Sequence, residues 1–259
     1  MLSLGFRSSD IYDKYREIIP EVMNEDNYSS QRTQLLKKFA DDIFEDRKFD
    51  SLRTRIGIVT TNIDMNRPTI FKTHAALAYS GKASFVPGFG ATISDALMAS
   101  TAAVPYFDSY VVHSEVQGKM HLIDGGFVAN NPSLFAITDA CGALEIERKR
   151  IRLLSVGVGS YTQRPIKSGM FSKIGKRLLD NYFPTDIFEK TFEANSNGTE
   201  NIVKFLFPDI KYFRVNSQYP VSEFSTNLLE SDLGHLEKMY QHGRRSFGEN
   251  EGAIIEVVN

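Results

Sequence analysis

The chain has 259 residues, of which 42% are hydrophobic and 24% are charged, and its formal net charge is −2. These values are typical of a folded globular protein, and a charge this close to zero argues against a dedicated nucleic-acid binder. Cys141 is the only cysteine, which excludes an intrachain disulfide and favours a reducing compartment. No run reaches the ~18 apolar residues of a membrane helix, and the first residues lack the basic start of a secretory signal. We therefore expect a cytoplasmic protein.

Hydrophobic periodicity predicts helices over residues 11–22 and 35–44, followed by strands over residues 55–61 and 69–72. Thr92-Ile-Ser-Asp95 is a capping-box pattern, and the helix that it opens is expected to run to residue 104, just before Pro105. Asn131 is predicted to cap a further helix that has Pro132 at its first position. The remaining predictions are strands over residues 120–124, 152–156 and 212–215, and helices over residues 171–182, 185–207 and 227–247.

Strands that alternate with helices in this way predict an α/β fold with a mostly parallel central sheet covered on both faces. The chain has no internal repeat and no linker rich in proline, glycine or serine. We therefore expect a single domain over residues 1–259.

Asp124 is the main candidate for a chemical role. It ends the strand predicted over residues 120–124, and in open α/β sheets ligands bind beyond the C-terminal ends of strands. Gly125 and Gly126 follow it and allow a tight turn with positive φ, which keeps side chains away from a substrate or partner. Asn130 and Asn131 then open a helix whose amides favour negative charge nearby. The spacing alone leaves two interpretations open, a catalytic carboxylate or a residue that closes a turn, since Asp-Gly-Gly is common in loops.

Three segments carry a family resemblance: residues 99–107 (ASTAAVPYF), 122–132 (LIDGGFVANNP) and 153–159 (LLSVGVG). Their sequences, order and separations closely resemble the patatin-like phospholipase family. The resemblance includes the strand at residues 69–72 and covers about residues 1–216. Residues 217–259 are left as a C-terminal helical region.

The resemblance implies a three-layer α/β/α domain that hydrolyses lipid esters with a serine–aspartate dyad. In that family the serine sits on a Gly-x-Ser-x-Gly elbow, and the aspartate of the Asp-Gly-Gly motif accepts the serine proton as general base. A glycine-rich loop supplies amides that stabilise the oxyanion. Carried over by motif, Asp124 is the general base and Gly125 and Gly126 complete its motif. The resemblance implies no metal and no organic cofactor.

The chain departs from the family pattern at the nucleophile. Its 259 residues contain no Gly-x-Ser-x-Gly and no glycine-rich loop before the first predicted strand. Ser3 stands two residues before Gly5, but it has neither a leading glycine nor a preceding strand, so we do not expect it to be the nucleophile. We expect instead that the chain starts just downstream of the elbow and lacks at least ~30 residues, the size of a βαβ unit. On this reasoning the 259 residues alone are inactive.

Two further features carry weaker signals. The basic cluster Arg148–Arg152 and an amphipathic stripe over residues 170–183 are predicted to be ordinary surface features or contacts with an anionic membrane. Three basic residues near the C-terminal helices are candidates for contact with an activating ligand: Lys204, Lys211 and Arg214.

Two functions follow as hypotheses. The first is a lipid acyl hydrolase that meets phospholipid, or another lipid ester, in transient contact with the inner membrane surface. The second is a catalytically inactive remnant that acts as a binding or regulatory module. Residues 8–12 and 192–197 also resemble bacterial phospholipases that serve as effectors in cyclic-nucleotide anti-phage defence. That narrower resemblance implies a cyclic nucleotide activator, while the net charge near zero argues against a nucleic acid polymer as partner.

Overall fold

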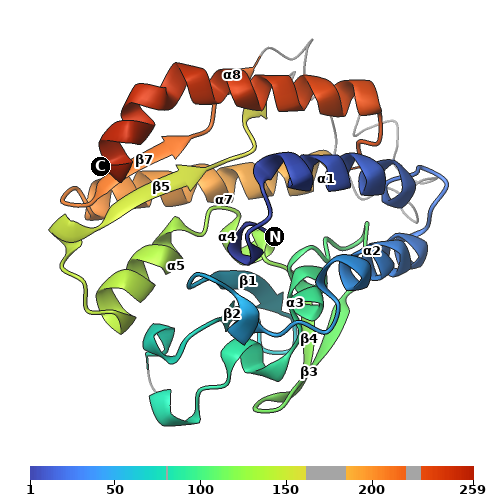
Figure 1. Cartoon of the computed structure of the whole chain (residues 1–259), viewed down its shortest axis with the longest axis horizontal. Coiled ribbons are helices and arrows are strands. Elements are labelled where there is room, and N and C mark those ends of the chain that lie inside the picture. The colour runs from blue at the N-terminus through green and yellow to red at the C-terminus, as the bar shows by residue number, and fades with distance from the viewer. Residues whose placement is uncertain (80, 162–184, 220–228) are drawn as a thin grey trace, which may run out of the picture.

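The computed structural model describes residues 1–79, 81–161, 185–219 and 229–259 (Figure 1). Its α-helices are α1 (Ser8–Val22), α2 (Ser29–Phe44), α3 (Ile93–Ser100), α4 (Gly126–Ala129), α5 (Ser133–Thr138), α7 (Thr185–Leu206) and α8 (Leu233–Val258). Its strands are β1 (Gly57–Asn62), β2 (Arg67–Lys72), β3 (Tyr110–Ser114), β4 (Gly118–Asp124), β5 (Arg152–Val156), β6 (Ser160–Tyr161), β7 (Lys211–Val215) and β8 (Gln218–Tyr219). The helix predicted over residues 171–182 lies outside the described residues. No helix of the described segments is both long enough and apolar enough to cross a membrane.

The α/β class is confirmed, but the mostly parallel central sheet is not. The largest sheet has the strand order β2-β1-β4-β3, and every pair in it is antiparallel. The short connections explain the antiparallel pairing of β1 with β2 and of β3 with β4. Residues 63–66 join the first pair and residues 115–117 join the second. Connections this short form hairpins, because parallel strands need a long crossover. Parallel pairing between described strands is limited to β5 with β7 and β6 with β8.

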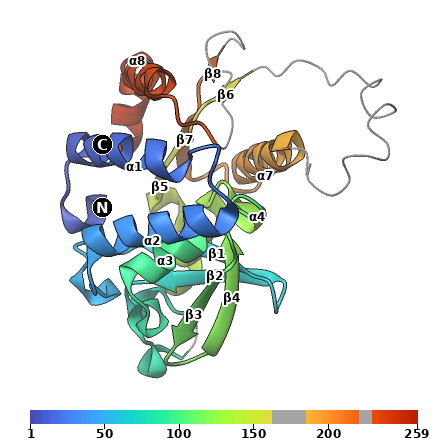
Figure 2. The ribbon, with the colours of Figure 1, turned by 90° about the vertical axis from the view of Figure 1, so that its right-hand side faces the viewer.

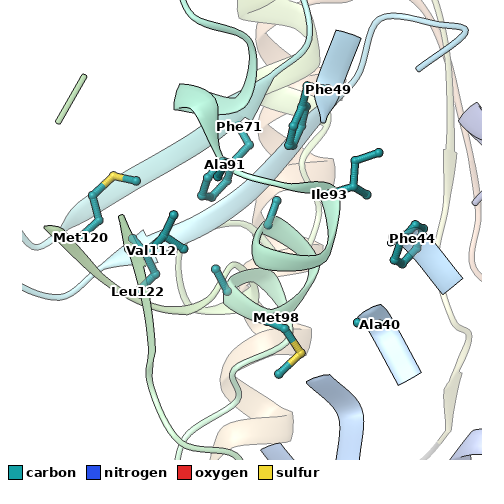
Figure 3. Packing of buried hydrophobic residues seen from close by; sticks show 12 residues of the cluster. Ala40, Phe44, Phe49, Phe71, Ala91, Ile93, Met98, Val112, Met120 and Leu122 are labelled. Carbon is teal, nitrogen blue, oxygen red and sulfur yellow. The ribbon is translucent and has the colours of Figure 1, made fainter. Parts of the chain in front are cut away.

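The larger sheet packs its core against α2 and α3. Ala96 and Met98 on α3 are buried, and so are Phe71 on β2 and Leu122 on β4 (Figure 3). Phe49 lies beside Phe71 with the ring centroids 6.1 Å apart. A second apolar cluster joins α5 and α7 to the smaller sheet through residues that include Ile137, Ile151, Val203 and Ile210. The four-stranded sheet and the β5-β7 sheet thus each have their own core, with helices packed against them (Figure 2).

Helix α3 begins where the capping box predicts, because Thr92 Oγ1 accepts a hydrogen bond from the Asp95 amide at 3.0 Å. It ends at Ser100, four residues earlier than predicted. The carbonyl of Ser100 accepts from the Gly125 amide at 3.3 Å, and the carbonyl of Ala102 accepts from the Asp124 amide at 3.0 Å. The end of α3 therefore pairs with the end of β4.

The first long helix of the chain, α1, packs on the last, α8 (Figure 1). The Tyr12 hydroxyl donates a hydrogen bond to Glu237, and its ring stacks on Tyr240 with the centroids 3.9 Å apart. Because this joint ties the first long helix to the last, it supports the single domain that we propose for residues 1–259.

A half-buried ion pair fastens the segment after β2 to the end of α5. Lys72 Nζ lies 2.5 Å from Asp139 Oδ1, and it also donates to the Leu77 carbonyl at 2.9 Å. The two side chains are only 11% and 15% exposed. Replacing Lys72 with methionine should lower the free energy of unfolding by about 2–3 kcal/mol, because it leaves the Asp139 carboxylate largely buried without its cation. Urea denaturation of both proteins measures this difference.

The control is Lys149→Met. Lys149 pairs with Glu147 at 2.9 Å, but these side chains are 70% and 58% exposed. Solvent screens such a pair, so its loss should cost less than about 0.5 kcal/mol. Equal losses in the two variants would contradict the role given to the Lys72–Asp139 pair.

Candidate active site

Asp124 is the last residue of β4, and its backbone is fixed on two sides. It stands opposite Thr60 of β1 in the sheet register. Its amide donates to the Ala102 carbonyl at 3.0 Å, and its carbonyl accepts from Thr61 Oγ1 at 2.8 Å. The strand end that the sequence predicts for Asp124 is therefore present.

Gly125 is required by lack of space and not by the positive φ that a glycine allows. Its φ is −67° and its ψ is −22°, which any residue adopts. A Cβ at this position would lie 2.1 Å from the carbonyl oxygen of Val59 in β1. Only glycine allows the backbone to approach β1 so closely. The positive φ that the two glycines allow is thus not adopted at Gly125, and the close approach to β1 explains the glycine instead.

Gly126 begins α4 and holds the Asp124 side chain. Its amide donates to Asp124 Oδ1 at 2.5 Å. Burial raises the pKa of the Asp124 carboxyl to about 6, and the hydrogen bond from Gly126 opposes this by a smaller amount. Among the described residues no other donor binds this carboxylate. Oδ2 is therefore available to receive a proton from a group placed beside it.

Helix α7 holds the residues that follow α4. The Asn130 amide donates to Asn195 Oδ1 at 3.1 Å, and Asn130 Nδ2 donates to the Phe192 carbonyl at 3.1 Å. The Phe127 and Phe192 rings meet edge to face with centroids 5.2 Å apart. Because these partners are more than sixty residues away in sequence, no local pattern predicts the contacts.

A buried polar network continues from Asn131 into the smaller sheet. Asn131 is 1% exposed, and its Oδ1 accepts from the Ser133 amide at 3.2 Å. Helix α5 begins at Ser133 with Pro132 as its N-cap, one residue later than predicted. Asn131 Oδ1 also accepts a hydrogen bond from Ser155 Oγ at 3.4 Å. Arg214 donates to Ser155 Oγ at 2.5 Å and to Ser196 Oγ at 2.8 Å. Arg214, which lies on β7, thus links this strand to β5 and to α7.

Lys204 and Lys211 differ from Arg214 in their surroundings. Lys204 lies 2.6 Å from Glu200 and Lys211 lies 3.7 Å from Glu256, and both lysines are well exposed. The side chain of Arg214 is only 6% exposed. Arg214 also lies 3.6 Å from Glu200 and so shares this carboxylate with Lys204, whereas Lys211 pairs with a different residue.

Ser3 is not brought to Asp124. It lies in the short 3-10 helix Leu2–Leu4, and its carbonyl accepts from the Arg53 amide at 2.8 Å. The N-terminus overlaps α4 in Figure 1 but lies on the opposite side of the molecule from it in Figure 2. This placement agrees with the expectation that Ser3 is not the nucleophile.

A cavity of about 280 Å³ lies between the four-stranded sheet and the β5-β7 sheet, and we call it the slot. Gly57 and Val59 of β1 line one side, and residues 153–156 of β5 line the other. β1 pairs with β4 only at residues 60–62, and the described partner of β5 is β7 alone. Both walls of the slot therefore include strand edges with no sheet partner among the described residues. Val59 lines the slot, and its carbonyl oxygen lies against Gly125, so the slot adjoins the Asp-Gly-Gly motif.

Comparisons with known proteins agree with this geometry. A family model for patatin-like phospholipases matches residues 3–137. The "cUMP-AMP-activated phospholipase" of Escherichia coli is 38% identical over 258 residues, which cover 100% of this chain and 78% of that protein. "Patatin-like protein 4" of Arabidopsis thaliana is 29% identical over 231 residues, covering 81% of this chain and 55% of its own length. The "cGAMP-activated phospholipase" of Vibrio cholerae is 29% identical over 130 residues, which are 48% of this chain and 34% of that protein.

Proposed function

We propose a function from one premise: the chain belongs to the patatin-like phospholipase family. The proposed reaction is hydrolysis of the carboxylic ester bonds of phospholipids, with Asp124 as the general base. The observation that carries this proposal is the Asp124 carboxyl, which is held at the end of β4 with a pKa of about 6 and has one oxygen bound by the Gly126 amide.

Asp124 would move protons in both halves of the reaction. It takes the proton of a serine hydroxyl while the serine oxygen attacks the ester carbonyl, and it returns the proton to the leaving alcohol. In the second half it takes a proton from water, which attacks the acyl-serine and releases a fatty acid. The proton then returns to the serine oxygen. A pKa of about 6 suits this work better than an ordinary aspartate, because the base is stronger and still mostly ionised at pH 7.

We propose that the serine comes from outside these 259 residues, which contain no Gly-x-Ser-x-Gly. The slot supports this inference, because its walls include strand edges of β1 and β5 beside residues of α5, and it adjoins the Asp-Gly-Gly motif through Val59. We propose that a strand ending in Gly-x-Ser-x-Gly occupies the slot, so that the serine emerges beside Asp124. This arrangement retains the expectation that the sequence begins downstream of the elbow.

The rate of hydrolysis should fall as the pH is lowered through about 6. Protonated Asp124 cannot accept the serine proton, so kcat/KM should follow an apparent pKa near 6 rather than 3.8. The measurement is fatty-acid release from phospholipid vesicles by the protein purified from its source cells. A range from about pH 4.5 to about pH 8 brackets the expected transition. An acid limb near pH 4 would contradict the buried carboxyl as the base.

The second candidate function is the inactive module, favoured by the absence of a nucleophile from the 259 residues. The intact mass of the native protein distinguishes the hydrolase from the inactive module. A native protein several kilodaltons heavier than 29.2 kDa that releases fatty acid supports the hydrolase. A native mass of 29.2 kDa without release supports the module.

Cyclic nucleotide activation is the proposed regulation. Two relatives are named for activation by cUMP-AMP and by cGAMP, and the first of them aligns over the whole of this chain. Fatty-acid release with and without added cUMP-AMP tests the proposal. We also propose a cytoplasmic protein that contacts the inner membrane surface only while acting on lipid.

A further inference from the structure

Helix α4 is too short to fix its own orientation. It spans only Gly126–Ala129, and the amides of its last two residues both donate to the Gly125 carbonyl, at 3.1 and 2.8 Å. A helix of this length has little stability of its own in water, so contacts with other elements must hold it. Its orientation matters for the site, because the Gly126 amide at its start donates to Asp124 Oδ1.

One side chain of α7 binds the far end of α4. Asn195 Oδ1 accepts a hydrogen bond from the Asn130 amide at 3.1 Å, and Asn195 Nδ2 donates to the Val128 carbonyl at 3.4 Å. The Val128 carbonyl is one of those at the helix end that have no partner inside the helix. The side-chain amide of Asn195 thus satisfies a donor and an acceptor of this backbone at once. Asn130 Nδ2 adds a bond to the Phe192 carbonyl, about one turn earlier on α7.

The part of α7 that carries Asn195 is itself fixed. The next residue, Ser196, is 4% exposed, and its carbonyl accepts from Asn131 Nδ2 at 3.4 Å while its Oγ accepts from Arg214 at 2.8 Å. Arg214 lies on β7 and also pairs with Glu200 of α7 at 3.6 Å. Figure 2 shows α4 between β4 and α7. Asn195 therefore joins the segment that follows β4, a strand of the four-stranded sheet, to a helix anchored on the β5-β7 sheet.

We propose that Asn195 is a positioning residue for hydrolysis: its side-chain amide fixes the end of α4 and so keeps the Gly126 amide on Asp124. The other end of this segment is held at Gly125, which lies against the Val59 carbonyl oxygen. Without Asn195, α4 can tilt about Gly125, and the tilt carries the Gly126 amide away from the carboxylate. Asn195 acts through α4 and not on the reacting atoms. The inference rests on the proposed function, in which Asp124 is the general base.

The test replaces Asn195 with alanine in the native, nucleophile-bearing protein and measures fatty-acid release from phospholipid vesicles. We expect kcat to fall by about ten- to hundredfold while KM stays within about twofold, because a misplaced base slows the chemical step without weakening lipid binding. The matched control is Asn201→Ala at an exposed position of the same helix, which should leave both constants unchanged. An unchanged kcat in Asn195→Ala, a rise in KM alone, or an equal loss of kcat in Asn201→Ala would overturn the proposal.

Amide hydrogen exchange in the same proteins distinguishes local loosening from a general loss of stability. Without lipid, peptides that cover residues 120–132 should exchange about tenfold faster in Asn195→Ala than in the wild type, since opening of α4 no longer breaks the Asn195 contacts. Peptides from residues 57–72, which include β1 and β2, should exchange at the wild-type rate. Faster exchange in both segments would make Asn195 a general stabiliser, and unchanged exchange in residues 120–132 would mean that other contacts hold α4. Either result would overturn the proposal.

Failure of this inference is distinguishable from failure of the proposed function. If Asn195→Ala loosens residues 120–132 but Asp124→Asn leaves hydrolysis intact, the catalytic assignment of Asp124 fails. If hydrolysis requires Asp124 but Asn195→Ala keeps the wild-type kcat, only the positioning role of Asn195 fails.

Discussion

Asp124→Asn is expected to reduce fatty-acid release by roughly a thousandfold or more in the native, nucleophile-bearing protein. Asparagine has nearly the same shape and keeps an oxygen for the Gly126 amide, but it cannot accept the serine proton. The measurement is kcat/KM on phospholipid vesicles at pH 7.5, a value chosen about 1.5 units above the expected pKa of the base. The control is Asp64→Asn, because Asp64 lies in the exposed turn after β1 and pairs with His121 there. Undiminished release by Asp124→Asn would remove the general base from the proposal.

The same variant should be more stable than the wild type near neutral pH. The folded-state pKa of Asp124 is about 6, above the ordinary 3.8, so the native state binds the proton more tightly than the unfolded state. Stability therefore falls as the pH rises from about 4 to 6, and the whole penalty is present above that range. Removing the charge should raise the free energy of unfolding by about 1–3 kcal/mol at pH 7.5. The gain should vanish below about pH 3, where both states of the wild type bind the proton.

Gly125→Ala should lower the free energy of unfolding by about 2–4 kcal/mol and also abolish hydrolysis. The added methyl would lie 2.1 Å from the Val59 carbonyl oxygen, which is part of a strand backbone and cannot rotate away. The backbone dihedrals suit alanine, so the loss would come from overlap alone. Relief of the overlap requires β4 to move away from β1, and this movement carries Asp124 with it. Thermal and urea unfolding measure the stability, and vesicle hydrolysis measures the activity.

Gly198→Ala is the matched control for this substitution. Gly198 lies inside α7, and a Cβ there would meet nothing within 4 Å. Alanine in an open helical position should be neutral or stabilising by up to about 1 kcal/mol. If Gly125→Ala were as stable as Gly198→Ala, the close approach of β4 to β1 would not be the reason for the glycine.

Local patterns in the sequence predicted much of the fold. Helix α7 was predicted over residues 185–207 and spans Thr185–Leu206, because its apolar residues repeat at helical spacing. The capping box of α3 and the position of Asp124 at a strand end are also local, and both are confirmed. Strand β3 was missed, and the predicted end of the last helix, residue 247, lies well before its observed end at Val258.

Features that depend on distant contacts were beyond the sequence patterns. The need for Gly125 arises from Val59, sixty-six residues earlier, so the motif suggested the wrong reason for the glycine. Arg214 alternates with apolar neighbours on β7 as an exposed residue would, yet Ser155 and Ser196 bury it. The antiparallel sheet follows from two short connections whose strands were only partly predicted. In each case the deciding partner lies in another element.

The slot between β1 and β5 also bears on quality control in the cell. Strand edges without partners are templates for pairing with other chains, and proteins normally cover or interrupt them. A polypeptide in which the slot stays empty would expose such edges and so be prone to aggregation. The strand proposed to fill the slot also brings the serine. Molecules that lack the nucleophile would therefore be the ones removed by chaperones and proteases, and catalytic competence and survival in the cell would depend on the same strand.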